Sequence, residues 1–193
     1  MTTQDIDKQC ITALILAGGE GRRTGGLDKG LITYRGKPLI QHVIERLAPQ
    51  VDTVIISCNR NTSDYLTHCK TLVSDTRAGF LGPLAGIESA LPAITTSHVL
   101  ISPCDTPHLP LDLVERLQHA AGERASGSVT ATIANDGNRD HYLNALITRE
   151  GISTVVDELN QGQRAVRKWL LKMNTARADF SDCPEAFLNI NTL

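Results

Sequence analysis

A glycine-rich segment behind a short apolar run carries the first residues that could do chemistry. The apolar residues 11–16 are followed, within 18–30, by six glycines and by three cations, Arg22, Arg23 and Lys29. Glycines directly after a buried strand let the backbone turn tightly and let amide N–H groups approach a ligand. Amides and cations together suit a polyphosphate, so the segment predicts a nucleoside triphosphate site. The alternative is a surface loop with solvated arginines.

The spacing of this segment departs from two common phosphate-binding loops. A Walker A loop needs Gly-Lys-Ser/Thr, whereas Lys29 is followed by Gly30. A dinucleotide fingerprint needs its third glycine three residues after the second, whereas four residues separate Gly21 from Gly26. The site must therefore be of another type.

Asp105 is the candidate metal ligand. It follows the apolar strand 99–101 and lies between Pro103 and Pro107, which stiffen the loop. An acidic residue at the tip of a central strand can hold a metal ion, and the alternative is a cap for the helix downstream.

Polar residues also end two other predicted strands. Asn59 follows the strand 51–57, and Asp75 follows the strand 71–74. In open α/β sheets ligands bind at the carboxyl ends of the strands, so both side chains are expected near the ligand. The alternative is that both residues only form turns, which Asn and Asp favour.

The elements that must position these residues alternate between strand and helix, which predicts an α/β fold. We expect a three-layer α/β/α domain with a mostly parallel central sheet and an inserted β-hairpin. The hairpin is predicted from two strand patterns joined by Asn-Asp-Gly-Asn at 135–138, a strong turn signal, and it is expected to give a mixed sheet with a layer added to the core. The expected strands are 11–16, 51–57, 71–74, 99–101, 128–134, 142–148 and 176–180, and the expected helices are 39–47, 63–68, 83–91, 111–121, 152–159 and 165–173.

Length and composition indicate one domain over 1–193, with 1–9 as a flexible tail. The chain has 193 residues, 41% of them apolar, and a formal net charge of −2. This charge gives no reason to expect a nucleic acid partner, and no apolar stretch is long enough for a membrane helix. Five scattered cysteines without a Cys-x-x-Cys pair argue against disulfides and zinc and fit a reducing cytoplasm.

The motifs as a set resemble those of the molybdenum cofactor guanylyltransferases (MobA), nucleotidyltransferases of the glycosyltransferase-A type. The resemblance covers nearly the whole chain. It rests on Leu-Ala-Gly-Gly at 16–19, Gly-Gly-Leu-Asp-Lys-Gly at 25–30, Gly-Pro-Leu-Ala-Gly at 82–86, Cys-Asp-Thr-Pro at 104–107 and Asn-x-Asn-Thr at 189–192. It implies a nucleotide-diphospho-sugar transferase-like fold, with GTP bound by the N-terminal half and a pterin cofactor by the C-terminal half.

The resemblance also implies a reaction and its residues. The terminal phosphate of the molybdopterin cofactor attacks the α-phosphorus of GTP, and pyrophosphate leaves. Lys29, Asp105 and Arg23 are the expected catalytic residues, with Asp105 holding Mg²⁺, which typically uses one or two carboxylates plus phosphates. The expected GTP-binding residues are Leu16, Ala17, Gly18, Gly19, Arg22, Gly26, Lys29, Asn59, Asp75, Gly82 and Asp105.

For the acceptor, Arg164, Asn189 and Asn191 match positions that the family uses around the pterin and its phosphate. In a strand the two asparagine amides would point to one face. Arg139 and Lys168 are weaker candidates. The expected partners are GTP and the pterin cofactor, with transient contacts to other cofactor-biosynthesis proteins and acceptor enzymes, and the protein is expected to be a monomer.

Two other functions remain open from the sequence. One is a nucleotidyltransferase that uses CTP, with molybdopterin or a sugar or polyol phosphate as acceptor. The other is a nucleotide- or pterin-binding carrier without chemistry, which would have no need for Lys29 and Asp105.

Overall fold

Short apolar runs build a seven-stranded sheet in the computed structural model, which describes residues 10–19, 27–79, 81–123 and 128–190. The strand order is β5-β4-β1-β6-β8-β7-β9, and only the two pairings that involve β8 are antiparallel. The strands are β1 (Ile11–Leu16), β4 (Thr53–Ser57), β5 (Leu72–Val73), β6 (His98–Pro103), β7 (Ala131–Asn135), β8 (Asp140–Thr148) and β9 (Thr175–Asp179). The expected mostly parallel sheet is confirmed.

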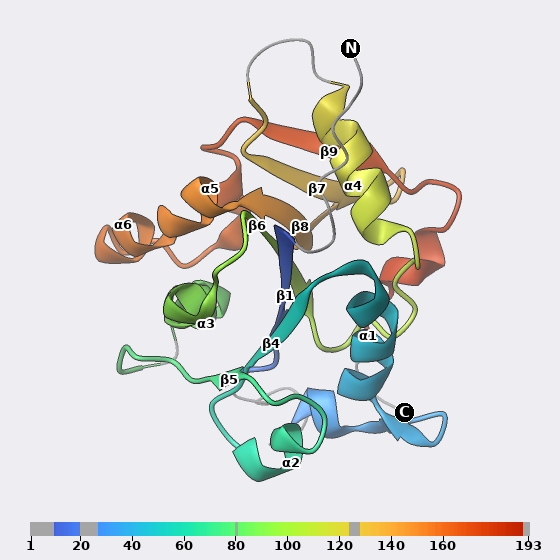
Figure 1. Cartoon of the computed structure of the whole chain (residues 1–193), viewed down its shortest axis with the longest axis vertical. Helices are drawn as coiled ribbons and strands as arrows, with labels where there is room; N and C mark the ends of the chain where they lie inside the picture. The colour runs from blue at the N-terminus through green and yellow to red at the C-terminus, as the bar shows by residue number, and fades with distance from the viewer. Residues whose placement is uncertain (1–9, 20–26, 80, 124–127, 191–193) are drawn as a thin grey trace.

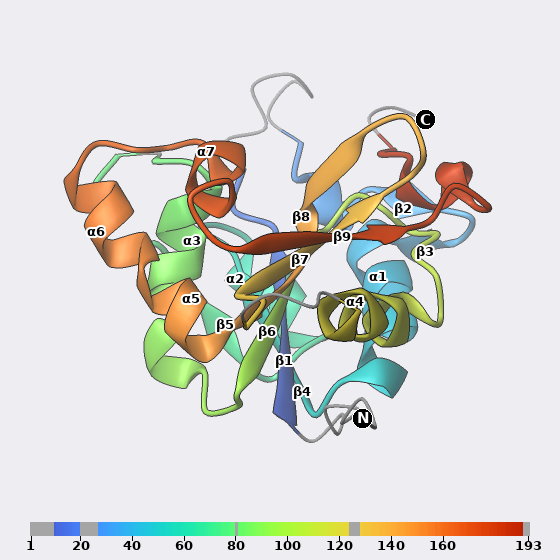
Figure 2. The ribbon, with the colours of Figure 1, turned by 90° about the horizontal axis from the view of Figure 1, so that it is seen from above.

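Helices cover both faces of this sheet (Figures 1 and 2). On one face lie α1 (Leu39–Leu47) and α4 (Leu113–Gly122), and on the other lie α3 (Pro83–Ala90), α5 (Arg149–Ser153), α6 (Val155–Asn160) and α7 (Val166–Leu170). Alternation along the strands fills both cores: Ala13 and Ile15 pack with the first set, and Leu14 packs with the second. The short α2 (Thr62–Leu66) follows β4, and the three-layer prediction is confirmed.

The predicted hairpin is present as β7 and β8, but its placement differs from the expectation of an added layer. The two strands lie within the main sheet, between β6 and β9. Residues 145–148 of β8 pair with residues 98–101 of β6, so backbone groups on that side of β8 are hydrogen-bonded within the main sheet. The hairpin therefore extends the sheet sideways and carries its turn toward the carboxyl edge of β6.

A second, two-stranded sheet was not predicted. It pairs β2 (Thr33–Tyr34) with β3 (Lys37–Pro38), after the 3-10 turn η3 (Lys29–Leu31). Arg35 and Gly36 both have positive φ, 48° and 82°, as the two central residues of a tight hairpin turn of the I′ type require. The remaining 3-10 turns are η4 (Ala48–Gln50), η5 (Leu91–Ala93) and η6 (Pro184–Phe187).

The C-terminal helices are shorter than predicted. The expected helix 152–159 is divided at Thr154 into α5 and α6, and Trp169 donates from Nε1 to the Thr154 hydroxyl at 2.9 Å. Trp169 is buried in the core. Residues 188–190 belong to no strand, so the strand geometry considered for Asn189 and Asn191 does not apply to Asn189.

Candidate active site

A cleft of about 290 Å³ opens at the carboxyl ends of β1, β4 and β6, where ligands bind in open α/β sheets. Eight of the eleven residues expected to bind GTP line it: Leu16, Ala17, Gly18, Gly19, Lys29, Asp75, Gly82 and Asp105. These residues come from segments far apart in the sequence. The structure therefore brings most of the predicted nucleotide site together.

Several predicted residues fall outside the part of the chain that the structure describes. They are Arg22, Arg23, Gly26 and Asn191. The predicted tail 1–9 also lies outside the described residues. Their expected roles stay predictions.

The glycines after β1 lie where the backbone passes close to the neighbouring strand. Ala17 donates its N–H to the Ser57 carbonyl at 2.8 Å. A Cβ at Gly18 would lie 3.1 Å from the Asn59 amide nitrogen, whereas a Cβ at Gly19 would meet open space. A side chain at Gly18 would thus crowd Asn59 in the interior, and the bare backbone at both positions leaves room for a ligand.

Asn59 and Asp75 form a reciprocal pair. Asn59 donates from Nδ2 to Asp75 Oδ2 at 2.9 Å and accepts at Oδ1 from the Asp75 backbone N–H at 2.8 Å. Burial raises the pKa of the Asp75 carboxyl, against the opposing effect of the Asn59 bond. Asp75 lines the cleft and Asn59 does not, so Asn59 orients Asp75 toward the space that a ligand would fill.

Lys29 and Asp105 meet in the cleft. Lys29 Nζ lies 3.1 Å from Asp105 Oδ2, although the two residues are 76 positions apart in the chain. Asp105 is 6% exposed, and it does not cap the helix that follows, because α4 begins at Leu113 with Asp112 at its N-cap position. The helix-cap alternative for Asp105 is therefore excluded.

The other oxygen of Asp105 is suited to a metal ion. Within the described ranges, buried Oδ1 of Asp105 has no hydrogen-bond partner, which is costly for a carboxylate that has lost its water. No three His, Cys, Asp or Glu side chains gather as metal ligands in the same ranges. A single carboxylate oxygen left without a described partner beside this cleft fits a hard divalent ion that completes its shell with ligand oxygens and water.

The C-terminal segment fixes Asp105 from the other side. Asn189 donates from Nδ2 to Asp105 Oδ2 at 3.3 Å, and the Ile190 N–H donates to the Asp105 carbonyl at 2.9 Å. Asn189, predicted to touch the acceptor, thus lies directly against the candidate metal ligand.

A second depression of about 490 Å³ adjoins the cleft and shares Pro103, Leu143 and Asn189 with it. Its remaining lining residues are Arg139, Asp140, His141, Tyr142, Asn144 and Leu188. The register of β7 and β8 shifts here, because Ile133 pairs with Ala145 and Ala134 pairs with His141. Residues 142–144 therefore bulge out of the ladder into the depression, a device often found beside active sites.

His141 and Asp136 brace this hairpin. His141 Nε2 lies 2.7 Å from Asp136 Oδ2, and its ring stacks on Phe187 with centroids 4.6 Å apart. Burial would raise the pKa of Asp136, but the His141 bond and the backbone N–H groups of Arg139 and Asn138 outweigh it and lower the pKa to about 2. The carboxylate is thus held ionised.

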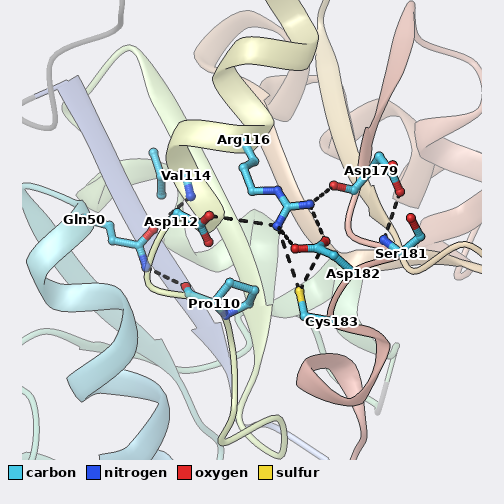
Figure 3. A network of polar contacts seen from close by, with 9 residues as sticks. All are labelled: Gln50, Pro110, Asp112, Val114, Arg116, Asp179, Ser181, Asp182 and Cys183. Atoms are coloured by element: carbon cyan, nitrogen blue, oxygen red, sulfur yellow. Dashed lines mark hydrogen bonds and ion pairs between the residues drawn. The ribbon is translucent and has the colours of Figure 1, made fainter.

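Arg116 of α4 holds the turn that leads from β9 to Asn189 (Figure 3). Its guanidinium donates to both carboxylate oxygens of Asp182, at 2.7 and 3.1 Å, and lies 4.1 Å from the centroid of the Phe180 ring. Phe180 packs edge-on against Phe187, with ring centroids 5.2 Å apart. This packing fixes the segment that brings Asn189 to Asp105.

Arg164 is not in the second depression. Its guanidinium donates to the carbonyls of Leu159 and Gln163, and its own carbonyl lies 3.7 Å from where a Cβ of Gly82 would stand. Arg164 therefore lies beside the start of α3, and it lines neither the cleft nor the second depression.

Sequence reasoning missed several cleft residues. The lining also includes Leu27, Ser57, Arg60, Pro83, Gly86, Pro103, Cys104 and Leu143. Gly86 had a usable signal, since a glycine inside a helix often marks a close approach. A Cβ there would collide with the Ser57 hydroxyl, so glycine at this position lets α3 lie close to β4 without displacing Ser57.

A family model described as a MobA-like NTP transferase domain matches residues 13–177. The molybdenum cofactor guanylyltransferase of Mannheimia succiniciproducens is 42% identical over 183 residues, which cover 95% of each chain. That of Shewanella putrefaciens is 41% identical over 183 residues, 95% of this chain and 92% of the relative. Molybdopterin-guanine dinucleotide biosynthesis protein A from Archaeoglobus fulgidus superposes with a TM-score of 0.73 at 24% identity, covering 94% of this chain and 92% of that one, which bears out the fold.

Proposed function

The chain belongs to the MobA-like NTP transferase family, as its motifs predict, and on that premise we propose that it transfers GMP from GTP to the terminal phosphate of the molybdenum–molybdopterin cofactor. Pyrophosphate is the second product. The observation that carries this function is the identity of 41 to 42% to molybdenum cofactor guanylyltransferases over nearly the whole chain. The Lys29–Asp105 pair in the cleft supports it chemically.

The nucleotide occupies the first cleft in this proposal. The backbone at Gly18 and Gly19 approaches the phosphates, and Lys29 neutralises the β- and γ-phosphates and the departing pyrophosphate. Phosphoryl chemistry of this type depends mainly on positioning and on neutralising charge. The Asp75 carboxylate, held by Asn59, can accept hydrogen bonds from the N1–H and N2–H₂ edge of guanine, which cytosine lacks.

Nucleotidyltransferases of this kind are generally metal-dependent, and we propose that the ion is Mg²⁺, held by Asp105. When bound, Mg²⁺ supplies positive charge between two polyanionic substrates. Asp105 Oδ1, which has no partner among the described residues, is the oxygen that would bind the ion. Lys29 and Asn189 hold the other oxygen, Oδ2, in place.

In this proposal the acceptor occupies the second depression, with its phosphate near Asn189; the support is that Asn189 lines both the depression and the cleft. A phosphate monoester has a second pKa of about 6, so it is largely dianionic near pH 7 and needs no strong general base. Its oxygen forms a bond to the α-phosphorus, and the bond from that phosphorus to the bridging oxygen breaks, with the electron pair leaving on pyrophosphate. Arg164, the other described candidate, would act from the nucleotide side.

The experiment that tests this function measures acceptor-dependent pyrophosphate release with GTP and CTP side by side. The proposal predicts turnover with GTP and much slower turnover with CTP. Faster turnover with CTP would favour the cytidylyl alternative, and tight binding of both substrates without pyrophosphate release would favour a carrier.

The proposal also covers the protein's location in the cell, its oligomeric state and its protein partners. All five cysteines lie in the described ranges and are free, which is compatible with the reducing cytoplasm that we propose as its location. Among the described residues, no helix has the length and apolar character needed to cross a bilayer. A monomeric state, one nucleotidyltransferase domain over 1–193, and transient contacts with other cofactor-biosynthesis proteins and acceptor enzymes belong to the same proposal.

A further inference from the structure

Asp28, in the middle of the Leu27-Asp28-Lys29 sequence, has a function different from its neighbours. We propose that Asp28 is a positioning residue which, held by Tyr65 and Asn61 of the β4–α2 segment, sets the place of the Lys29 ammonium in the nucleotide cleft. The inference rests on the proposed function, because it assumes that Lys29 binds the β- and γ-phosphates.

The backbone directs the three neighbouring side chains to opposite sides. Leu27 and Lys29 line the cleft, whereas Asp28 does not and is buried at 8% exposure. Asp28 has extended backbone angles, φ −81° and ψ 112°, and in extended backbone successive side chains point to opposite faces. Asp28 is therefore turned away from the ligand and into the protein, where it can serve neither as a metal ligand nor as a phosphate contact.

Donors from one neighbouring segment converge on the buried Asp28 carboxylate. The Tyr65 hydroxyl donates to Oδ1 at 2.5 Å, and Asn61 Nδ2 donates to Oδ2 at 3.1 Å. The Arg60 guanidinium lies 3.7 Å from Oδ2 and also donates to the Leu27 carbonyl at 3.0 Å. Hydrogen bonds to an ionised group are stronger than neutral ones, so this set anchors the end of the glycine-rich segment.

Tyr65 is the rigid member of this set. Its side chain is fully buried, and burial, with the neighbouring Cys104 and Asp28, raises the pKa of its hydroxyl, so the phenol stays protonated as a donor. Position 30 packs directly against it, because a Cβ on Gly30 would collide with the hydroxyl. The ring thus fixes the backbone on both sides of Lys29, at Asp28 through a hydrogen bond and at Gly30 through contact.

The position of the Lys29 ammonium depends on the backbone that the Asp28 contacts hold in place. Its side chain is 31% exposed and its ammonium is 3.1 Å from Asp105. A flexible lysine side chain loses much rotamer freedom when it is held at one point, so a fixed backbone lowers the cost of placing the charge. Displacing the anchor should weaken the phosphate contact without changing what the base contacts.

The test compares affinities for GTP and GMP by calorimetry, with Mg²⁺ present, in the wild type, Lys29→Ala, Tyr65→Phe and Tyr34→Phe. Tyr65→Phe removes one hydroxyl and keeps the ring. Tyr34→Phe is the matched control, since it removes a hydroxyl that lies 3.0 Å from His108 Nε2, and neither Tyr34 nor His108 lines the cleft. Asn61→Gly is a second variant. It deletes the side-chain amide, and glycine tolerates the left-handed backbone of this position, where φ is 52°.

The expected result is that Tyr65→Phe weakens GTP binding by about tenfold, the low end for losing one hydrogen bond to a charged group, and leaves GMP binding unchanged. Asn61→Gly should lower the ratio of the affinity for GTP to the affinity for GMP in the same way, and Tyr34→Phe should leave this ratio unchanged. Because GMP lacks the β- and γ-phosphates, this ratio separates the position of Lys29 from general damage to the fold.

Three results would overturn the inference, and they are distinguishable. If Lys29→Ala lowers the ratio but Tyr65→Phe behaves as Tyr34→Phe, the anchor has no such role and the proposed function stands. If Tyr65→Phe weakens GTP and GMP binding equally, the effect is structural. If the wild type does not prefer GTP to GMP, or if Lys29→Ala leaves the preference intact, the phosphate assignment in the proposed function is itself wrong.

Discussion

Replacement of Asp105 by asparagine should separate catalysis from stability. The Lys29–Asp105 pair has one partner that is about a third exposed, so it is expected to contribute at most about 1 kcal/mol to folding. Against this, the buried Oδ1 has no partner among the described residues, and a neutral amide atom in that position costs less to bury than a carboxylate oxygen, which offsets the loss. The free energy of unfolding of Asp105→Asn should therefore stay within about 1 kcal/mol of the wild type.

Activity should fall far more. An amide oxygen is a weaker ligand for Mg²⁺ than a carboxylate, and charge stabilisation by a catalytic metal is worth several kcal/mol. A loss of about 4 kcal/mol in the transition state corresponds to a fall in kcat of about a thousandfold. Acceptor binding should be largely retained, because the second depression does not include Asp105.

The assay pairs steady-state pyrophosphate release with urea unfolding, for Asp105→Asn and for the control Asp112→Asn. Asp112 is an exposed carboxylate before α4, and it lines neither the cleft nor the depression. The control should behave as the wild type in both measurements. Near-normal turnover of Asp105→Asn would refute the metal assignment, and a fall in activity matched by unfolding would refute the stability reasoning.

Two further predictions follow from close contacts. Gly86→Ala should lower the free energy of unfolding by about 1–2 kcal/mol, because overpacking against Ser57 outweighs the gain in helix propensity, and it should weaken GTP binding. Adding Ser57→Ala should restore both stability and binding, which urea unfolding and calorimetry measure. The pKa of Asp136 is lowered to about 2, so its contribution to stability is present above the unfolded value of about 4 and is lost as pH falls from about 4 to 2. His141→Gln should therefore flatten the acid side of the stability–pH curve, measured as urea midpoints between pH 5 and 2; an unchanged slope would contradict a role for the His141–Asp136 hydrogen bond.

Sequence patterns predicted the sheet and most of the nucleotide cleft because both depend on local signals. The apolar run 11–16 followed by glycines marks a strand and a turn, and polar residues after strands collect at one edge whatever the strand order. The same reasoning predicted that Asp105, which follows a central strand, lies in the cleft. Such reasoning needs only the direction of each strand.

The missed features depend on long-range packing. No spacing rule brings Tyr65 next to Asp28, because the contact joins the loop before η3 to helix α2, two segments far apart in the sequence. The register shift that takes residues 142–144 out of the β7–β8 ladder is likewise invisible in the alternation of β8. Arg164 was grouped with Asn189 by family resemblance alone, and the fold places it at the start of α3.

The most direct test of the central claim follows the label of GTP during incubation with Mg²⁺ and the molybdenum–molybdopterin cofactor. One sample carries the label on the α-phosphate and another on the γ-phosphate, and the products are separated and weighed by mass spectrometry. Guanylyl transfer predicts a dinucleotide heavier than the cofactor by one GMP residue, with the α-label in that product and the γ-label in pyrophosphate. A γ-label in the modified cofactor, or release of free phosphate in place of pyrophosphate, would contradict guanylyl transfer.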